Sequence, residues 1–114
     1  MLRRLVIALM LIGVASSANA TMTVIFKYYK AAKSEEKAYY KLYLDGLREG
    51  IIELNVVLQT RKQPLFCMPG KLALTDEQAE DIIMRQAEKV ADPDTSPIGF
   101  LLIAGLIDTF PCQH

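Results

Sequence analysis

Two cysteines are the side chains in this chain best able to do chemistry. Cys67 lies within residues 65–70, Cys112 lies near the C-terminus, and each is close to a proline, where a helix does not continue easily. If they pair, they close a loop of 46 residues, counting both ends, and such a crosslink stabilises a fold by roughly 4 kcal/mol. The alternatives are two free thiols or half of a metal site. A metal site needs more ligands, and the only histidine is His114.

Three carboxylates could do acid–base chemistry if they were buried together. Asp45, Glu49 and Glu53 recur every four residues, which places them along one stripe of a helix. Lys41 and Arg48 are adjacent to this stripe. A solvated charged surface is therefore favoured over a buried pair of carboxylates whose pKa values differ enough for acid–base catalysis. The sequence has no nucleophile beside a base, no phosphate-binding glycine loop and no metal-ligand spacing. It therefore predicts a binding protein that needs no cofactor or metal, rather than an enzyme.

The N-terminus predicts export. Residues 1–20 combine the basic Arg3 and Arg4, an apolar run over 5–15 and small residues that end at Ala20, which is typical of a cleaved secretory signal peptide. The apolar run is too short to span a bilayer comfortably, so we expect no stable membrane anchor after cleavage. A buried N-terminal helix is the alternative. Export to an oxidising compartment favours the Cys67–Cys112 disulfide.

The mature chain, residues 21–114, is the length of one domain. The full chain has 13 basic and 13 acidic residues; without Arg3 and Arg4 the balance becomes 11 against 13, or about −2. This charge does not favour a nucleic-acid partner. Basic residues gather early and acidic ones late, which gives either a dipolar surface or ordinary solvated faces: Lys27, Lys30, Lys33, Lys37 and Lys41, against Asp76, Glu77, Glu80, Asp81, Glu88, Asp92 and Asp94.

Hydrophobic periodicity predicts helices throughout the mature chain. Residues 21–33 are ambiguous and favour a short helix. A long amphipathic helix is expected from a cap at Ser34 to about Arg61. Gly46 and Gly50 lie one turn apart on its apolar face, which favours a second helix that crosses there at close range. The predicted apolar face is Tyr39, Tyr43, Gly46, Leu47, Gly50, Ile51, Leu54, Val57 and Leu58.

Two further helices are expected in the second half. Thr75 and Gln78 form a capping box that starts a helix. Ser96 is expected to cap the last helix, with Pro97 at its first position. That helix is apolar nearly all round and should be central. The predicted buried face of the earlier helix is Ala79, Ile82, Ile83, Gln86 or Ala87, and Val90. The fold class is therefore all-α, a small bundle of about four helices tied by one disulfide.

Three segments resemble the Rap/Tai family in their order and spacing. Residues 43–50 resemble its Tyr-x-x-Gly-x-x-x-Gly/Ala helix, residues 66–69 its Phe-Cys-x-Pro segment with Leu74, Thr75 and Gln78 after it, and residues 110–112 its C-terminal Phe-Pro-Cys. Together they cover roughly residues 38–112. The resemblance implies an all-helical periplasmic immunity protein of a type VI secretion system, which binds and inhibits a peptidoglycan amidase effector. Some members act as dimers, so it also implies a homodimer. The alternative function is a periplasmic chaperone or stress-response binding protein.

A candidate partner-binding loop spans residues 91–97. Asp92 and Asp94 offer hydrogen-bond acceptors, Thr95 and Ser96 offer hydroxyl groups, and the flanking prolines restrict the backbone. A rigid convex loop suits the blocking of an enzyme cleft because little entropy is lost on binding. An ordinary connector between helices is the alternative. The competing surface is the segment 70–73, Gly-Lys-Leu-Ala, next to Cys67.

Overall fold

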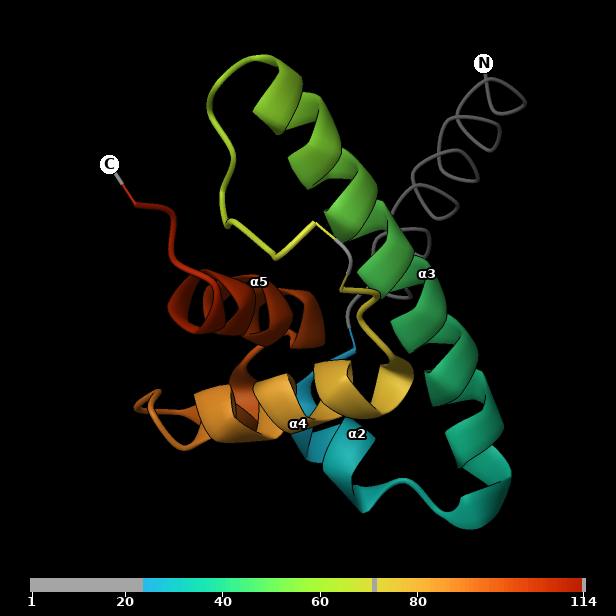
Figure 1. Cartoon of the computed structure of the whole chain (residues 1–114). Helices are drawn as coiled ribbons and strands as arrows, with labels where there is room; N and C mark the ends of the chain where they lie inside the picture. The colour runs from blue at the N-terminus through green and yellow to red at the C-terminus, as the bar shows by residue number, and fades with distance from the viewer. Residues whose placement is uncertain (1–23, 71, 114) are drawn as a thin grey trace, which may run out of the picture.

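The chain folds as a small all-α bundle closed by a disulfide (Figure 1). The computed structural model describes residues 24–70 and 72–113, so the predicted signal peptide, Lys71 and His114 lie outside the described residues. The described part contains four α-helices, one 3-10 turn and no strand, as expected. The elements are α2 (Phe26–Ala31), α3 (Ser34–Thr60), α4 (Asp76–Ala87), η1 (Pro93–Thr95) and α5 (Ile98–Thr109).

Helix α5 supplies the centre of the core. Its side chains Ile98, Leu101, Leu102 and Leu106 are fully buried, and α4 lies beside it (Figure 1). A methyl group at Gly105 would overlap the Ile82 side chain of α4 and lie 3.2 Å from the Ile82 carbonyl oxygen. A glycine is therefore needed where α4 and α5 approach each other. The expectation that α5 is central is confirmed, although its outer face is open at Phe100, which is 55% exposed.

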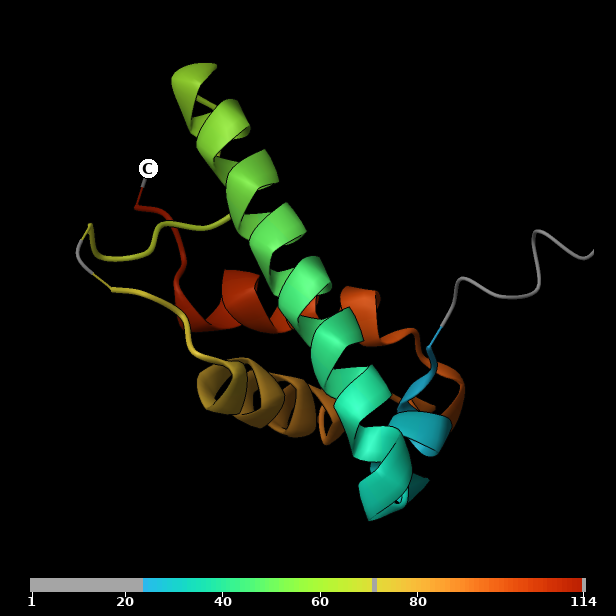
Figure 2. The ribbon, with the colours of Figure 1, turned by 90° about the vertical axis from the view of Figure 1, so that its right-hand side faces the viewer.

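Helix α3 crosses α4 and α5 and continues past them toward its C-terminal end (Figure 2). It buries Leu44, Ile51 and Asn55 against the bundle. The predicted apolar face is only half right, because Tyr39, Leu54 and Val57 are exposed. The reason is that the rest of the domain covers one side of this helix, while the apolar residues extend around more than one side.

The predicted close crossing at Gly46 and Gly50 is wrong. Both glycines are exposed, and no atom of the described chain lies within 4 Å of a methyl group added at either position. The close approach of α5 to α3 occurs instead at Gly99, where an added methyl group would lie 3.3 Å from Leu47 Cδ1. The two glycines of α3 therefore have no packing partner within the described chain.

The helix starts follow the sequence signals at one of three places. The capping box is confirmed, because Gln78 N donates to Thr75 Oγ1 at 3.2 Å and Thr75 N donates to Gln78 Oε1 at 3.0 Å. The cap at Ser34 is wrong, since Lys33 is the N-cap residue and no side chain caps that end. The cap at Ser96 is also wrong, because Pro97 is the N-cap residue and the Ser96 hydroxyl bonds elsewhere.

The described chain begins with an extended pair of residues and then α2. Ile25 forms an isolated antiparallel bridge with Pro97, and Phe26 is buried in the core. The predicted short helix within 21–33 is thus present from Phe26, and residues 21–23 lie outside the described residues. This contact fixes the start of the domain against the segment that precedes α5.

Candidate functional site

The predicted partner-binding residues form one compact turn, η1. The Thr95 hydroxyl donates to Asp92 Oδ2 at 2.9 Å, and the Ser96 hydroxyl donates to the Asp92 carbonyl oxygen at 2.8 Å. Asp92, Asp94 and Thr95 are exposed, and Ser96 is half-buried. The structure therefore brings the four residues together. Asp92 accepts both hydroxyl hydrogen bonds, and the carboxylate of Asp94 faces water.

The turn is held at its base by the start of the domain. Phe26 N donates to the Ser96 carbonyl oxygen at 2.9 Å, and Ile98 N donates to the Val24 carbonyl oxygen at 2.8 Å. Phe26 itself is only 5% exposed, so these bonds join the turn to the core. A turn fixed in this way before binding loses less conformational entropy when a partner docks.

A cleft of about 340 Å³ lies between α2, α3 and α4. One wall carries lysines and the other carries carboxylates, while aromatic and aliphatic side chains form the rest of the lining: Lys30, Lys37, Lys41, Asp76, Glu77, Glu80, Tyr29, Tyr40, Leu44 and Met84. Sequence reasoning found the early basic and late acidic residues but not this cleft. The two runs come from different helices, and only the folded chain shows that they face each other.

Two tyrosines of the cleft pack edge to face. The ring centroids of Tyr29 and Tyr40 are 5.8 Å apart, and their planes are 77° from parallel. Burial raises the pKa of Tyr29 to about 12, with further contributions from the negative charges of Glu80 and Asp76. The Tyr29 hydroxyl therefore stays protonated at neutral pH and can donate a hydrogen bond to a ligand.

The competing surface at residues 70–73 is also exposed. Gly70, Leu72 and Ala73 face water, and Leu72 is 40% exposed. Leu72 N donates to the Pro69 carbonyl oxygen at 3.0 Å, shortly after Cys67. Lys71 lies outside the described residues. Unlike the turn at 92–96, this segment has one described backbone bond and no side-chain bond.

The disulfide joins two distant motifs of the sequence. Cys67 and Cys112 are bonded, with their Cα atoms 4.9 Å apart. Cys67 N also donates to the Phe110 carbonyl oxygen at 2.8 Å, so the backbones meet beside the covalent bond. The predicted pairing is confirmed, and neither sulfur is available as a thiol nucleophile or metal ligand.

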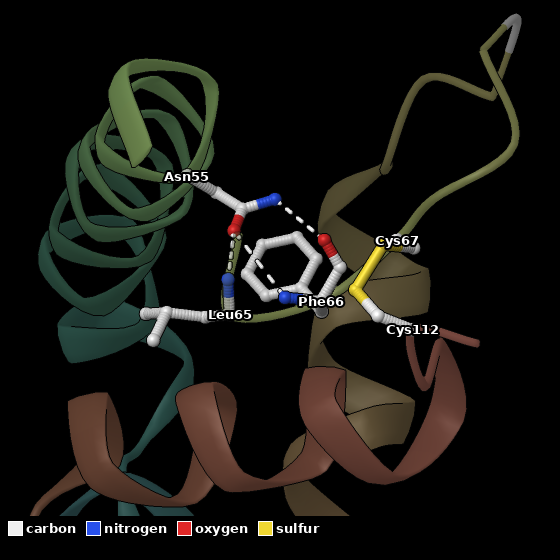
Figure 3. The surroundings of a disulfide bond; sticks show 5 residues. All are labelled: Asn55, Leu65, Phe66, Cys67 and Cys112. Atoms are coloured by element: carbon white, nitrogen blue, oxygen red, sulfur yellow. Dashed lines mark hydrogen bonds between the residues drawn. A yellow bond between two sulfur atoms is a disulfide. The ribbon is translucent and has the colours of Figure 1, made fainter. Parts of the chain in front are cut away.

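Asn55 holds the same loop from the other side, and sequence reasoning missed it (Figure 3). Its Nδ2 donates to the Phe66 carbonyl oxygen at 2.8 Å, and its Oδ1 accepts from Leu65 N at 2.7 Å and Phe66 N at 3.3 Å. Phe66 is 1% exposed and Asn55 is 8% exposed. The available signal was a polar residue four positions after Ile51, on the buried side of α3.

Arg48 joins α3 to the start of α4. Its guanidinium donates to Asp45 Oδ1 at 2.7 Å, to Asp76 Oδ1 at 3.1 Å and to the Leu74 carbonyl oxygen at 2.6 Å. The hydrogen bonds from Arg48 and Asp76 hold the pKa of Asp45 below its usual value, while the hydrogen bond with Asp45 raises the pKa of Asp76. Asp45 is thus part of a clamp between helices, whereas Glu49 and Glu53 are exposed.

The described residues show no constellation for metal chemistry. Within 24–70 and 72–113, no three His, Cys, Asp or Glu side chains are grouped so that they could hold a metal ion. In the same part of the chain, no helix is long and apolar enough to cross a membrane. The described chain is thus a helical bundle closed by a disulfide. Its surface carries an exposed acidic turn at 92–96 and a cleft lined by both positive and negative charges.

These features define the class of protein as a small all-α domain closed by one disulfide. Comparison with known proteins gives no closer assignment, since no protein-family model, curated protein or solved structure matches this chain.

Proposed function

We propose that this protein is a periplasmic immunity protein that binds and inhibits a peptidoglycan amidase effector of a type VI secretion system. The observation that carries the proposal is the exposed turn at 92–96, in which the hydroxyl groups of Thr95 and Ser96 both donate to Asp92. An enzyme that cleaves peptidoglycan has an open cleft, and a rigid convex turn can fill it with little loss of entropy. Asp94 then provides a charged acceptor at the tip.

The resemblance to the Rap/Tai family supports this function. Its Phe-Cys-x-Pro and Phe-Pro-Cys segments correspond to residues 66–69 and 110–112, and these are the two segments that the disulfide joins. A motif pair that is distant in sequence and bonded in space is a stronger resemblance than either motif alone. The third segment, at 43–50, lies on α3, which packs on both α4 and α5.

Two features support the periplasm as the compartment. Residues 1–20 are predicted to be a cleaved signal peptide. The Cys67–Cys112 disulfide is of the kind that persists in oxidising compartments such as the periplasm. Both features favour a protein that meets its effector in the periplasm.

A chaperone or stress-response binding protein is the second candidate function. Large apolar side chains are exposed along α3 and at the start of α5, and such surface can hold unfolded clients: Tyr39, Leu42, Leu54, Val56, Val57 and Phe100. This candidate predicts binding to many proteins with little selectivity. The immunity proposal predicts one partner.

Affinity capture from periplasmic extract separates the two functions. The tagged protein is expressed in cells that receive effectors from sibling cells, and retained proteins are identified by mass spectrometry. The immunity proposal predicts retention of one small secreted Cys/His amidase, and protection of cells that secrete this amidase into their own periplasm. Retention of varied unfolded proteins without a hydrolase, and no protection, would refute it in favour of the chaperone.

A further inference from the structure

The cleft between α2, α3 and α4 is large enough for a small ligand, and the proposed function does not use it. Its volume is about 340 Å³, which is within the range of small-molecule sites. The helix α2, the N-terminal half of α3 and the helix α4 surround it (Figure 1). No residue of the turn at 92–96 lines the cleft. The cleft and the turn are therefore separate surfaces.

The two charged walls of the cleft are not joined by ion pairs. Lys37 and Lys41 of α3, which we call the lysine pair, line one wall. Glu77 and Glu80 of α4, which we call the glutamate pair, line the other. No ion pair in the described part of the chain joins one pair to the other. Both walls therefore keep charges that a ligand in the cleft can neutralise.

Two further charged groups of the cleft already have partners. The Nζ atom of Lys30 lies 5.8 Å from the centroid of the Phe26 ring, in a cation–π contact. Asp76 Oδ1 accepts a hydrogen bond from Arg48 Nε at 3.1 Å. The groups left for a ligand are the lysine pair and the glutamate pair, whose charges sum to zero. Such walls favour a ligand that carries both charges, because a ligand with one charge is attracted by one wall and repelled by the other.

The rest of the lining suits an apolar side chain. Tyr29 and Tyr40 are half-buried and pack edge to face, and their exposed ring surface can cover carbon atoms of a ligand. Leu44 is buried and Met84 is half-buried in the same lining. The Tyr29 hydroxyl, with its pKa raised to about 12, stays protonated and can donate to a carbonyl oxygen. The cleft thus combines apolar surface, a hydrogen-bond donor and two walls of opposite charge.

We propose that this cleft binds a short zwitterionic peptide of about two or three residues. The lysine pair receives the terminal carboxylate, the glutamate pair binds the terminal ammonium group, and an apolar side chain packs on the tyrosines. A dipeptide separates its terminal charges by about 7 Å, at about 3.5 Å per residue, whereas a free amino acid carries both on one residue. The peptide therefore reaches both walls more easily. The proposal stands whether or not the turn at 92–96 binds an amidase.

Titration with leucyl-leucine tests the site. The protein is labelled with ¹⁵N, purified from the periplasm and followed by NMR. The amide signals of the cleft residues should shift to saturation with a dissociation constant below about 1 mM. Acetylation of the peptide's amino group, or amidation of its carboxyl group, should each raise this constant about tenfold, because each removes one charge. Free leucine should also bind about tenfold more weakly. No saturable shift at the cleft, or equal binding of free and blocked peptides, would overturn the proposal.

A variant of the lysine wall tests which end of the peptide it binds. Lys37→Gln with Lys41→Gln should bind the amidated and the free peptide equally well, since no cation remains to distinguish the carboxylate. The same variant should still prefer the free peptide to the acetylated one. Lys27→Gln with Lys33→Gln is the matched control, because these lysines are exposed and lie outside the cleft. It should keep both preferences of the parent.

A variant of the glutamate wall should give the opposite result. Glu77→Gln with Glu80→Gln should bind the acetylated and the free peptide equally well and still prefer the free peptide to the amidated one. Glu49→Gln with Glu53→Gln is the matched control, because both glutamates are exposed on α3 and do not line the cleft.

Each wall variant must lose one preference and keep the other, so a variant that merely unfolds cannot give the expected result. A wall variant that keeps the preference for its own end of the peptide, or a control that loses it, would overturn the proposal.

Discussion

At the scale of single residues, Asn55 is the side chain on which the disulfide loop depends most after the cysteines. Its amide satisfies three backbone groups of Leu65 and Phe66. These groups lie on a segment without regular secondary structure, so no helix bonds can replace them. Buried backbone groups without partners are costly.

Asn55→Ala is therefore expected to lower the free energy of unfolding by about 2–3 kcal/mol. The measurement is urea unfolding followed by circular dichroism. Gln59→Ala is the control, because Gln59 is exposed one turn later on α3 and should change the free energy by less than about 0.5 kcal/mol. Equal effects of the two substitutions would contradict the role given to Asn55.

The Arg48 clamp makes a prediction with a defined sign in pH. The pKa of Asp45 is lowered, so the stability that its ionised form contributes is lost as the pH falls through that pKa. The pKa of Asp76 is raised, so the unfavourable ionisation of Asp76 disappears as the pH falls. The two contributions oppose each other in the parent protein. Arg48→Gln removes the shared cation and leaves two neighbouring carboxylates, whose repulsion raises the pKa of the pair.

We therefore expect Arg48→Gln to be less stable than the parent at pH 7 and to recover part of that loss at pH 5. Recovery follows because a carboxyl pair with raised pKa takes up a proton as the pH falls, which removes the repulsion. Urea unfolding of both proteins at the two pH values measures the difference in their free energies of unfolding. A loss that is the same size at both values would show that the carboxylates do not interact.

At the scale of elements, the C-terminal end of α3 has a non-glycine residue where glycine is favoured. Lys62 has φ of 60°, in the left-handed region. Gln63 N donates to the Leu58 carbonyl oxygen at 2.9 Å and Lys62 N donates to the Gln59 carbonyl oxygen at 3.0 Å, which is the Schellman arrangement. The backbone at Lys62 is therefore strained for a residue with a side chain.

Lys62→Gly is expected to raise the free energy of unfolding by up to about 1 kcal/mol, because glycine adopts this conformation without strain. Thermal unfolding measures the change. Gln63→Gly, one residue later, serves as the control and should not stabilise the protein, since Gln63 does not have positive φ. A lower melting temperature for Lys62→Gly would contradict the assignment of strain.

The helices and their contacts differ in how far the sequence could predict them. Periodicity and the box at Thr75 and Gln78 were enough to predict the four helices and one of their caps, because these are local interactions. The partners of Asn55 lie 10 and 11 residues away in a loop, and the partners of Arg48 outside its own helix lie 26 and 28 residues away. Such contacts depend on how the helices cross, and no spacing rule contains that information.

The sequence could likewise predict one part of the candidate site and not another. The turn at 92–96 could be predicted from Asp, Pro, Thr and Ser in one short segment. The hydrogen bond from Phe26 N that supports the turn could not be predicted, because it depends on where the start of the domain packs. The error at Gly46 and Gly50 arose because glycine on an apolar face predicts a close approach without saying whether it comes from the same chain.

At the scale of the whole molecule, the disulfide closes about half of the domain into one loop. The loop from Cys67 to Cys112 contains α4, η1 and α5, while Asn55 joins it to α3. A loop of this length loses much chain entropy in the unfolded state when it is crosslinked. The turn at 92–96 lies within this loop, while its base is held from outside the loop by Val24 and Phe26.

Cys67→Ser with Cys112→Ser should lower the free energy of unfolding by about 2–4 kcal/mol. Urea unfolding with and without reductant gives the measurement: the parent should lose stability on reduction, and the double variant should not respond to it. Thiol titration of the unfolded, unreduced parent should find no free thiol. Two thiols per chain would contradict the bond.

We propose that the turn at 92–96 inhibits the amidase, and inhibition by charge-reversed variants tests this most directly. The assay uses purified peptidoglycan and the amidase retained in the affinity capture. Asp92→Lys with Asp94→Lys should raise the concentration needed for half-inhibition at least tenfold. Its melting temperature should change little, because both charges and the Thr95–Asp92 hydrogen bond that Asp92→Lys removes are exposed to water.

The matched control reverses two exposed carboxylates of α3, outside the turn and its connection to α4, with Glu49→Lys and Glu53→Lys. Both double variants change the net charge equally, so a difference between them reports position rather than overall charge. We expect the control to inhibit the amidase as the parent does and the turn variant to need an at least tenfold higher concentration. Inhibition by Asp92→Lys with Asp94→Lys equal to that of the parent would refute the role proposed for the turn.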